Sequence, residues 1–247
     1  MSELINNASG AVLESVNPAT QETLPGDFPK STIEQINTAT TNAHEAWKIY
    51  KNTSGKNKAE FLRTIASEIE ALGDTLVHRV MAESGLPEGR IKGERGRTCN
   101  QLRLFATLVE EGSWVNAVID EAIPDRQPMP RVDIRKISVA LGPVAVFTAS
   151  NFPLAFSTAG GDTVSALAAG CPVIVKAHPS HLGTNALVAQ AISTAVEKCN
   201  LPKGVFTSLN GDIETGQLLV QHPLVKAVGF TGSYRGGKAL FDLANSR

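Results

Sequence analysis

Short apolar runs alternate with longer segments of helical pattern through the second half of this chain. The runs are Pro143–Thr148, Val173–Val175, Val205–Leu209 and Ala227–Phe230. Short continuous apolar runs, bounded by turn residues, are typical of strands that are buried on both faces. Strands that alternate with helices along a chain predict a parallel sheet with right-handed crossovers. The predicted fold class is therefore α/β, with a doubly wound parallel sheet over residues 142–247.

The segments between the runs carry helix signals. Helices are predicted over Ser157–Gly170, Thr184–Lys198, Ile213–Val220 and from Ser233 to Asn245. Gly170, followed by Pro172, is a typical helix stop, because glycine ends the helix and proline cannot continue it. Polar residues that follow the strands of such a sheet face its ligand crevice.

The first half of the chain predicts a layer of helices after an extended arm. Residues 1–30 are expected to be extended, with a strand over Ala11–Val16, and Ser31 and Glu34 have the spacing of a capping box. Apolar positions at helical spacing predict helices over residues 33–51, 56–72, 74–85 and 87–111. We expect three parts: an arm and helices over 1–117, an extended segment over 118–141, and the α/β core over 142–247.

The segment between the helices and the core is rich in proline. Pro124, Pro128 and Pro130 predict a loop or the start of an edge strand. Val132–Leu141 alternates between apolar and polar residues, which predicts a strand with one solvent face. Two interpretations stay open: an ordinary edge strand, or a strand that reaches a neighbouring subunit.

Charge and composition exclude several classes of function. A net charge of −1 gives no electrostatic reason to expect nucleic acid or an anionic membrane as a partner. The apolar runs are too short to span a bilayer, and the first residues lack a secretory signal, so we expect a cytoplasmic protein. The three cysteines are widely spaced, and the five histidines include no helical pair at metal spacing. We expect neither disulfides nor a metal site.

Two polar residues follow strand ends, where ligands bind in this fold class. Asn151 comes after the first apolar run, and its amide can donate to an oxyanion or can satisfy backbone groups of the turn. Lys176 ends the second run, and its ammonium can bind a ribose hydroxyl or a phosphate, or can simply reach solvent. Their shared location at strand ends favours the ligand-binding interpretation of both.

Glycines mark the other strand-to-helix junctions. The segment from Phe230 to Gly237 reads FTGSYRGG, and free amides at such a helix start bind phosphate. The same glycines are equally suited to close packing of a helix on a sheet, and the spacing matches neither the dinucleotide fingerprint nor the P-loop. Asn210-Gly211 and Gly216 flank another helix start, where turn formation is the simpler interpretation.

Three motifs, taken in order, resemble those of the NAD(P)-dependent aldehyde dehydrogenase superfamily. They are Ala149-Ser150-Asn151-Phe152-Pro153, the segment GCPVIVK that ends at Lys176, and Phe230-Thr231-Gly232-Ser233. Asn17-Pro18-Ala19-Thr20 is similar to the family's N-terminal motif. Within the family, SNFPLAFSTAGGDT and VKAHPSH are most similar to the 2,5-dioxovalerate (α-ketoglutarate semialdehyde) and NADP-linked fatty aldehyde dehydrogenases.

The resemblance implies a Rossmann-like cofactor domain and an enzyme that oxidises an aldehyde to an acid with NADP or NAD. In this family a cysteine forms a thiohemiacetal with the substrate, here expected to be an acidic semialdehyde, and the full-length form is a homo-oligomer. Asn151 matches the asparagine that holds the oxyanion, Lys176 the lysine at the adenosine ribose, and Ser233 the pyrophosphate-side helix start. The cofactor-binding positions implied are Thr148, Ala149, Ser150, Lys176, His178, Pro179, Gly211, Gly216, Phe230, Thr231, Gly232, Ser233 and Gly237.

One departure from the family pattern concerns the nucleophile. The family's Gly-Gln-x-Cys motif and its general-base glutamate both follow the Phe-Thr-Gly-Ser element, and the sequence ends at Arg247 before either. Cys99, Cys171 and Cys199 are expected to be structural thiols. We therefore expect the N-terminal part of an aldehyde dehydrogenase that is inactive alone. The alternatives are a catalytically inactive nucleotide-binding fragment and an unrelated Rossmann-like binding protein, which the motif set disfavours.

A second departure concerns the choice of cofactor. NAD-preferring relatives commonly carry a glutamate three residues after the lysine, and Pro179 stands there in this chain. We expect no carboxylate to repel a 2′-phosphate, and Lys176 with His178 or His181 could attract it, although the histidines add charge only when protonated, mainly below about pH 6.5. The sequence therefore predicts that NADP is used at least as well as NAD.

Overall fold

Four parallel strands form the central sheet of the computed structural model, which describes residues 11–246. The strands are β5 (Val144–Phe147), β6 (Val173–Lys176), β7 (Phe206–Leu209) and β8 (Ala227–Phe230), in the order β7-β6-β5-β8. Phe147 pairs with both Lys176 and Phe230, so the strands end in register at one edge of the sheet. The loops that follow all four strands therefore meet at this carboxyl edge.

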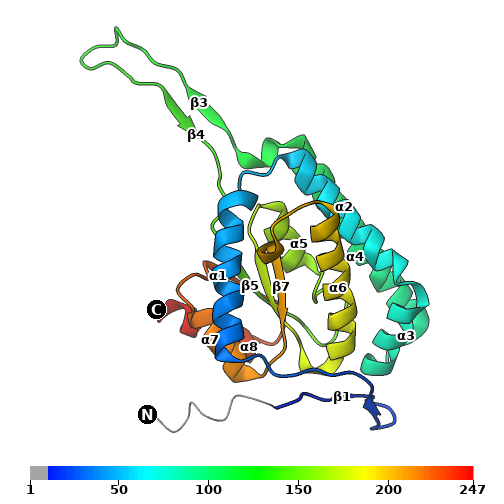
Figure 1. Cartoon of the computed structure of the whole chain (residues 1–247). Coiled ribbons are helices and arrows are strands. Elements are labelled where there is room, and N and C mark those ends of the chain that lie inside the picture. Colours follow the sequence, from blue (N-terminus) through cyan, green and yellow to red (C-terminus); the bar gives the residue numbers. More distant parts are fainter. Residues whose placement is uncertain (1–10, 247) are drawn as a thin grey trace.

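Helices cover both faces of the sheet, because the side chains of each strand alternate between two cores. Val144 and Val146 belong to a core with the helices α2 (Gly55–Ala71), α4 (Glu88–Glu111), α5 (Gly161–Ala168) and α6 (Leu182–Lys198). Ala145 and Phe147 face the other core, with α1 (Ile33–Tyr50), α7 (Ile213–Gln221) and α8 (Tyr234–Asn245). The prediction of a doubly wound α/β fold is confirmed (Figure 1).

The predicted helical layer is also present. Its helices are α1 (Ile33–Tyr50), α2 (Gly55–Ala71), α3 (Gly73–Ser84) and α4 (Glu88–Glu111). Helix α2 packs along α4 and also against α6, so α2 and α4 cover the same face of the sheet as α6, whereas α1 contributes Ile36, Ala39 and Ala43 to the core on the other face (Figure 1). The predicted cap of α1 is wrong by one residue, because Thr32 is the N-cap and forms a capping box with Gln35. Among residues 11–246, no helix is both long and apolar enough to cross a membrane.

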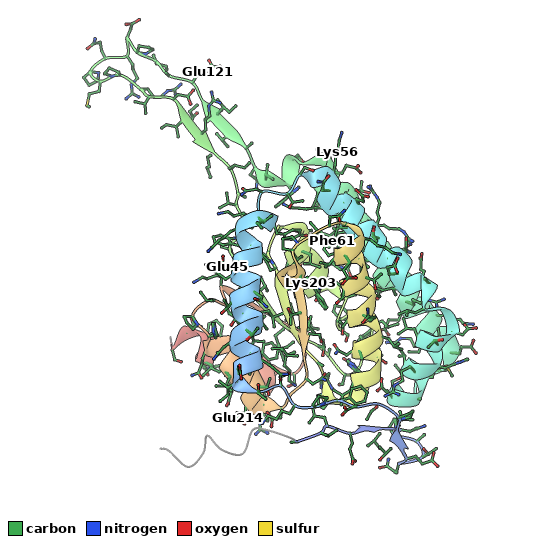
Figure 2. All side chains as sticks on the ribbon, in the orientation of Figure 1. Glu45, Lys56, Phe61, Glu121, Lys203 and Glu214 are labelled. Carbon is green, nitrogen blue, oxygen red and sulfur yellow. The ribbon has the colours of Figure 1, made fainter. Side chains whose placement is uncertain are left out.

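The extended segment forms a hairpin that projects away from the rest of the molecule (Figure 1). Strand β3 (Val118–Asp120) pairs with β4 (Ile134–Lys136), and neither pairs with the central sheet. The strand predicted over Val132–Leu141 is therefore wrong in length, and the edge-strand interpretation is wrong as well. Figure 2 shows Glu121 and its neighbours on this hairpin pointing into solvent. A contact with a neighbouring subunit stays a prediction.

The predicted helix after β5 begins later than expected. Residues 149–160 form turns, and α5 starts only at Gly161. The Glu94 carboxylate on α4 accepts the backbone N–H groups of Leu154 and Ala155 at 2.8 and 2.9 Å, which fixes the loop outside the helix. At Gly160 a Cβ atom would approach the Ala155 carbonyl oxygen to 2.6 Å, so the turn requires glycine there.

The N-terminal arm crosses beneath the carboxyl edge (Figure 1). It contains two short strands, β1 (Ser15–Val16) and β2 (Thr23–Leu24). The strand predicted over Ala11–Val16 is therefore longer than the one observed. The expectation that residues 1–10 are extended lies outside the described residues. Phe28 packs with Ala177 and Leu182. Short 3₁₀ helices lie at Ser113–Val115, Pro179–His181 and Lys203–Val205.

Candidate functional site

A cavity of about 1100 Å³ opens at the carboxyl edge of the sheet. Each strand contributes to it from its end or the following loop: Thr148 after β5, Lys176 on β6, Asp212 after β7 and Ser233 after β8. Helices α7 and α8 supply the opposite wall. Its location agrees with the rule that ligands of open α/β sheets bind outside the carboxyl ends of the strands. Its size suits an organic ligand.

The structure brings about half of the predicted cofactor positions together in this cavity. The positions that line it are Thr148, Lys176, His178, Pro179, Gly216, Phe230 and Ser233. Those that lie outside its lining are Ala149, Ser150, Gly211, Thr231, Gly232 and Gly237. Ala149 accepts a hydrogen bond from His181, and Thr231 donates to Asp162 at 3.2 Å, so both contribute to internal packing.

Lys176 is the half-buried cation of the cavity. Within residues 11–246 its ammonium group has no hydrogen-bond or ion-pair partner. Burial lowers the pKa of Lys176 from its usual value, and the charge of nearby Asp212 opposes that shift. A partly desolvated lysine without a partner is available to a ligand that supplies hydroxyl or phosphate oxygens.

Two histidines follow Lys176 at this end of the sheet. Burial lowers the pKa of His178 to about 4, with His181 and Lys176 adding repulsion, so its imidazole is neutral at neutral pH. His181 is 1% exposed, and its Nε2 lies 2.8 Å from the Ala149 carbonyl oxygen, to which it donates. His178 therefore adds no positive charge for a phosphate at neutral pH, and attraction of a phosphate by a protonated histidine stays a prediction for acid conditions.

Glycine is required at several positions around the cavity, for different structural reasons. A Cβ atom on Gly211 would lie 2.1 Å from the Thr215 hydroxyl, so glycine is needed for the turn into α7. Gly216 faces the Phe147 ring, where a Cβ atom would come to 2.9 Å, so it lets α7 approach the sheet. Gly232 and Gly237 both face the Phe230 ring in the same way. Close packing thus accounts for all four, and Gly216 also lines the cavity.

The start of α8 presents free backbone donors to the cavity. Ser233 is the N-cap, and its hydroxyl accepts the N–H of Gly236 at 3.2 Å. Both residues line the cavity, together with Arg235, whose guanidinium has no partner in the described part of the chain. The positive end of the helix dipole and an unpaired arginine make this wall suitable for an anion.

The sequence reasoning missed three charged residues of the lining, Asp212, Arg235 and Asp242. Asp212, the N-cap of α7, contradicts the expectation that no carboxylate faces this site. Arg235 adds a cation to the same lining. Arg235 stands directly within the FTGSYRGG segment, so its position could have been read from the sequence. Asp212 could have been found from its place as a capping residue after the third strand.

Asn151 lies in the exposed loop after β5, three residues beyond Thr148. Its amide makes no hydrogen bond to any residue in the range 11–246. The alternative that Asn151 satisfies backbone groups of the turn is therefore wrong, and its amide is available to another group.

The aldehyde dehydrogenase family model matches residues 5–247. The chain belongs to the aldehyde dehydrogenase family. It is 52% identical to alpha-ketoglutaric semialdehyde dehydrogenase 2 of Azospirillum brasilense and 48% identical to alpha-ketoglutaric semialdehyde dehydrogenase of Acinetobacter baylyi. These matches cover 97% of this chain but 46% and 45% of the relatives, so the chain spans about half their length. The fold is similar to that of an NADP-dependent enzyme of E. coli, with a TM-score of 0.79, 28% identity, and coverage of 96% and 46% of the two chains.

The three cysteines of this aldehyde dehydrogenase chain lie in packed surroundings. Cys99 and Cys171 are buried in the core of the helical face. Burial raises the pKa of Cys99 to about 11 and also raises the pKa of Cys199, so both remain thiols at neutral pH. A thiol nucleophile needs its thiolate form and access to the substrate. None of the three lines the cavity at the carboxyl edge.

We predict that the purified 247-residue chain forms no NAD(P)H from aldehydes, because none of its cysteines can act as the nucleophile. NAD(P)H fluorescence would be followed with a panel of semialdehydes, with the protein at micromolar concentration. The control is an extended polypeptide that includes the family's Gly-Gln-x-Cys motif, which is expected to be active. NAD(P)H formation by the short chain that disappears in a Cys99→Ala, Cys171→Ala or Cys199→Ala variant would contradict the prediction.

Proposed function

We propose that the cavity at the carboxyl edge binds the adenosine and pyrophosphate parts of a nicotinamide cofactor. The observation that carries the proposal is the unpartnered Lys176 ammonium in a cavity that the start of α8 also faces. Lys176 would bind the adenosine ribose, and the backbone amides after Ser233 would bind the pyrophosphate. Phe147 and Phe230 line the same cavity and offer apolar contact to the nucleotide.

We further propose aldehyde oxidation as the reaction of a polypeptide in which this chain is joined to the family's cysteine and glutamate motifs. The bound nicotinamide supplies hydride acceptance. Asn151 would donate its amide to the oxygen that becomes negatively charged when the aldehyde is attacked. An acidic semialdehyde such as 2,5-dioxovalerate is the proposed substrate, supported by relatives that are about half identical and carry that name.

A nucleotide-binding polypeptide without oxidation chemistry is the second candidate for the chain alone. The burial of Cys99 and Cys171 favours it, because neither thiol can reach a ligand in the cavity. Both candidate functions use the same nucleotide site. They differ only in whether the polypeptide oxidises an aldehyde.

We also propose that the site accepts NADP at least as well as NAD. Pro179 lines the cavity and supplies no carboxylate, and Lys176 and Arg235 supply two cations there. The 2′-phosphate carries more than one negative charge near neutral pH, so its nearest charged neighbours decide the preference.

The proposed site is tested by the Pro179→Glu variant. We expect it to weaken NADP binding by roughly tenfold and NAD binding by less than threefold, since a carboxylate near the 2′-phosphate repels only NADP strongly. Dissociation constants would be measured by calorimetry with the 247-residue chain. Thr107→Glu, which adds the same charge to the exposed face of α4, is the matched control and should change neither constant. Wild-type binding of neither cofactor would refute the site, and an equal loss of both would indicate backbone damage at Pro179.

A further inference from the structure

One lysine of the N-terminal arm reaches the wall of the cavity. The Nζ of Lys30 lies 3.0 Å from Oδ2 of Asp212 and 2.8 Å from Oε2 of Glu214. The Lys30 side chain is 11% exposed, whereas the two carboxylates are about half exposed. Figure 2 shows Glu214 near the start of α7, beside the arm. Lys30 thus bridges two carboxylates that lie 182 and 184 positions further along the chain and would otherwise stand unpaired.

The arm holds Lys30 in this place through its backbone. The N–H of Lys30 donates to the Ala11 carbonyl oxygen, and the N–H of Ser31 donates to the Asn210 carbonyl oxygen, both at 2.9 Å. The second bond ties the arm directly to the loop that carries Asp212. Lys30 is therefore positioned by folded backbone on both sides, and its ammonium is presented to the carboxylates rather than to solvent.

Asp212 is the carboxylate of this pair that faces the cavity. Its Oδ1 accepts the N–H of Thr215 at 3.2 Å as the cap of α7, and its Oδ2 faces Lys30. Burial alone would raise the pKa of Asp212, but the bonds from Lys30 and Thr215 hold it below the usual value. The carboxylate therefore stays ionised at neutral pH, close enough to Lys176 to act on the pKa of that lysine.

Lys30 neutralises the carboxylate that stands beside Lys176. The lining carries Lys176 and Arg235 as cations and Asp212 and Asp242 as carboxylates, and Asp242 is paired with Lys238 at 2.5 Å. Among the described residues, Lys30 is the ion-pair partner of Asp212, so without it this carboxylate would be unpaired in the cavity wall. A ligand with an extra phosphate would then meet repulsion from Asp212, and a ligand without that phosphate would meet much less.

We propose that Lys30 is a specificity-determining residue of the cofactor site: it neutralises Asp212 in the cavity wall, and so admits a nucleotide that carries a 2′-phosphate. This inference rests on the proposed nucleotide function of the cavity. Lys30 acts through Asp212 and need not contact the nucleotide itself. Lys30 lies on the N-terminal arm, outside the segments that hold the cofactor-binding motifs.

The proposal is tested with two nucleotides that differ only in the 2′-phosphate, 2′,5′-ADP and 5′-AMP. Their dissociation constants would be measured by calorimetry on the 247-residue chain. We expect Lys30→Met to weaken the binding of 2′,5′-ADP roughly tenfold and the binding of 5′-AMP less than twofold, because one unit charge near a divalent phosphate is removed. The difference between the two nucleotides should shrink from about 0.05 to about 0.5 M salt, where charges are screened over shorter distances.

Three further variants separate charge from structure. Lys30→Arg keeps the cation and should bind both nucleotides like the wild type. Lys30→Met combined with Asp212→Asn should regain most of the lost 2′,5′-ADP affinity, since asparagine still caps the helix. Asp212→Asn alone, in which the arm and Lys30 are intact, should strengthen 2′,5′-ADP binding several-fold and leave 5′-AMP within twofold. This variant keeps the test decisive if Lys30→Met does not fold.

The outcomes distinguish this inference from the proposed function. If the wild-type chain binds neither nucleotide, the proposed function fails. If the wild type binds both, and Lys30→Met weakens them equally or not at all, Lys30 is only a clamp for the arm and the inference is overturned. Asp212→Asn without an effect on the preference between the two nucleotides would overturn it in the same way.

Discussion

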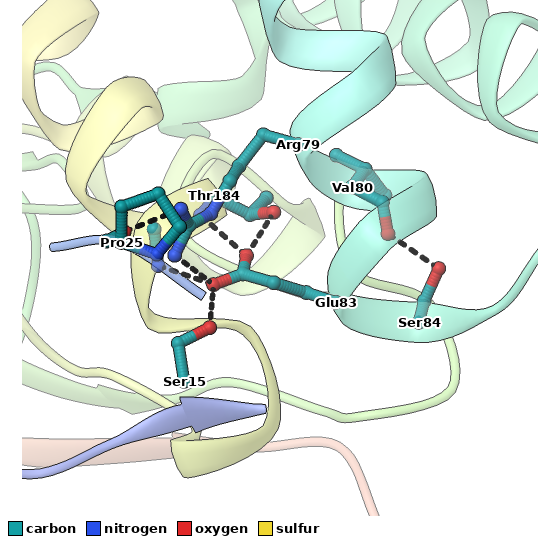
Figure 3. Close-up of polar contacts among 8 residues, drawn as sticks. Ser15, Pro25, Arg79, Val80, Glu83, Ser84 and Thr184 are labelled. Carbon is teal, nitrogen blue, oxygen red and sulfur yellow. Dashed lines mark hydrogen bonds and ion pairs between the residues drawn. The ribbon is translucent and has the colours of Figure 1, made fainter. Parts of the chain in front are cut away.

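Replacing Glu83 by alanine is expected to lower the free energy of unfolding by about 3–5 kcal/mol, the usual cost of removing one partner from a buried ion pair. Glu83 lies on α3 and is 3% exposed. Its Oε1 accepts from Ser15 Oγ at 2.5 Å, Arg79 at 2.8 Å and the N–H of Gly183 at 2.7 Å. Its Oε2 accepts both the N–H and the hydroxyl of Thr184 at 2.7 Å (Figure 3).

This carboxylate joins three parts of the chain that are distant in sequence. Ser15 belongs to the arm, Arg79 to α3 itself, and Gly183 and Thr184 to the first turn of α6. Free N–H groups at a helix start favour a negative charge, so Glu83 also compensates the dipole of α6. Removing it would leave the two buried amides of Gly183 and Thr184 without acceptors and would leave Arg79 with the Pro25 carbonyl oxygen but no carboxylate, which accounts for the large expected cost.

The effect of Glu83 on stability should depend on pH in a defined direction. Burial would raise the pKa of Glu83, but the bonds from Arg79, Ser15 and Thr184 outweigh it and hold the pKa below its usual value. A depressed folded pKa contributes stability that is fully present above the unfolded pKa of roughly 4.3 and is lost as the pH falls through the folded pKa. The difference in stability between the wild type and Glu83→Gln should therefore be constant at neutral pH and shrink in acid.

Urea denaturation and thermal melts of Glu83→Ala and Glu83→Gln would measure this effect. A loss of 4 kcal/mol, the middle of the range above, corresponds to a fall of roughly 8–16 °C in Tm for a chain of this size. Glu88→Ala is the matched control, because Glu88 is an exposed carboxylate paired with Lys92 on α4, and its removal should leave the stability close to that of the wild type. A loss below about 1 kcal/mol for Glu83→Ala would mean that water replaces the carboxylate at these donors.

The central sheet could be predicted from the sequence because its two middle strands, β5 and β6, are buried on both faces. Residues such as Val173–Val175 must then be apolar throughout, and glycine and proline mark their ends. The hairpin between β3 and β4 could not be predicted, because its two short strands pair only with each other and bury no side-chain face. An alternating pattern on an exposed ribbon looks the same as one on an edge strand.

The candidate site was predicted only in part, for a related reason. Residues such as Lys176 and Ser233 stand at strand ends, which the sequence locates directly. Which loop residues turn toward the cavity depends on tertiary contacts instead. Ala149 is held away by His181, and Lys30 reaches the site from the other end of the chain. Neither contact has a local sequence signal, because each joins residues that are far apart along the chain.

In a polypeptide extended through the family's cysteine and glutamate motifs, Asn151→Ala is expected to lower kcat by about 10²–10³, the usual effect of removing one oxyanion donor. The physical reason is that the amide would stabilise negative charge that develops only in the transition state. The dissociation constants for NADP and NAD should stay within twofold, because Asn151 lies outside the lining of the nucleotide cavity.

The same substitution should leave the fold unaffected, which makes Asn151 a clean test. Its side chain is exposed and has no hydrogen bond to the described residues, so Tm should change by less than about 1–2 °C. Ser150→Ala, the neighbouring exposed position, is the matched control and should retain wild-type kcat. Single-turnover kinetics would separate the chemical step from product release. If Asn151→Ala kept wild-type kcat in that step, Asn151 would be only an exposed loop residue, and the oxyanion donor would have to come from elsewhere in the polypeptide.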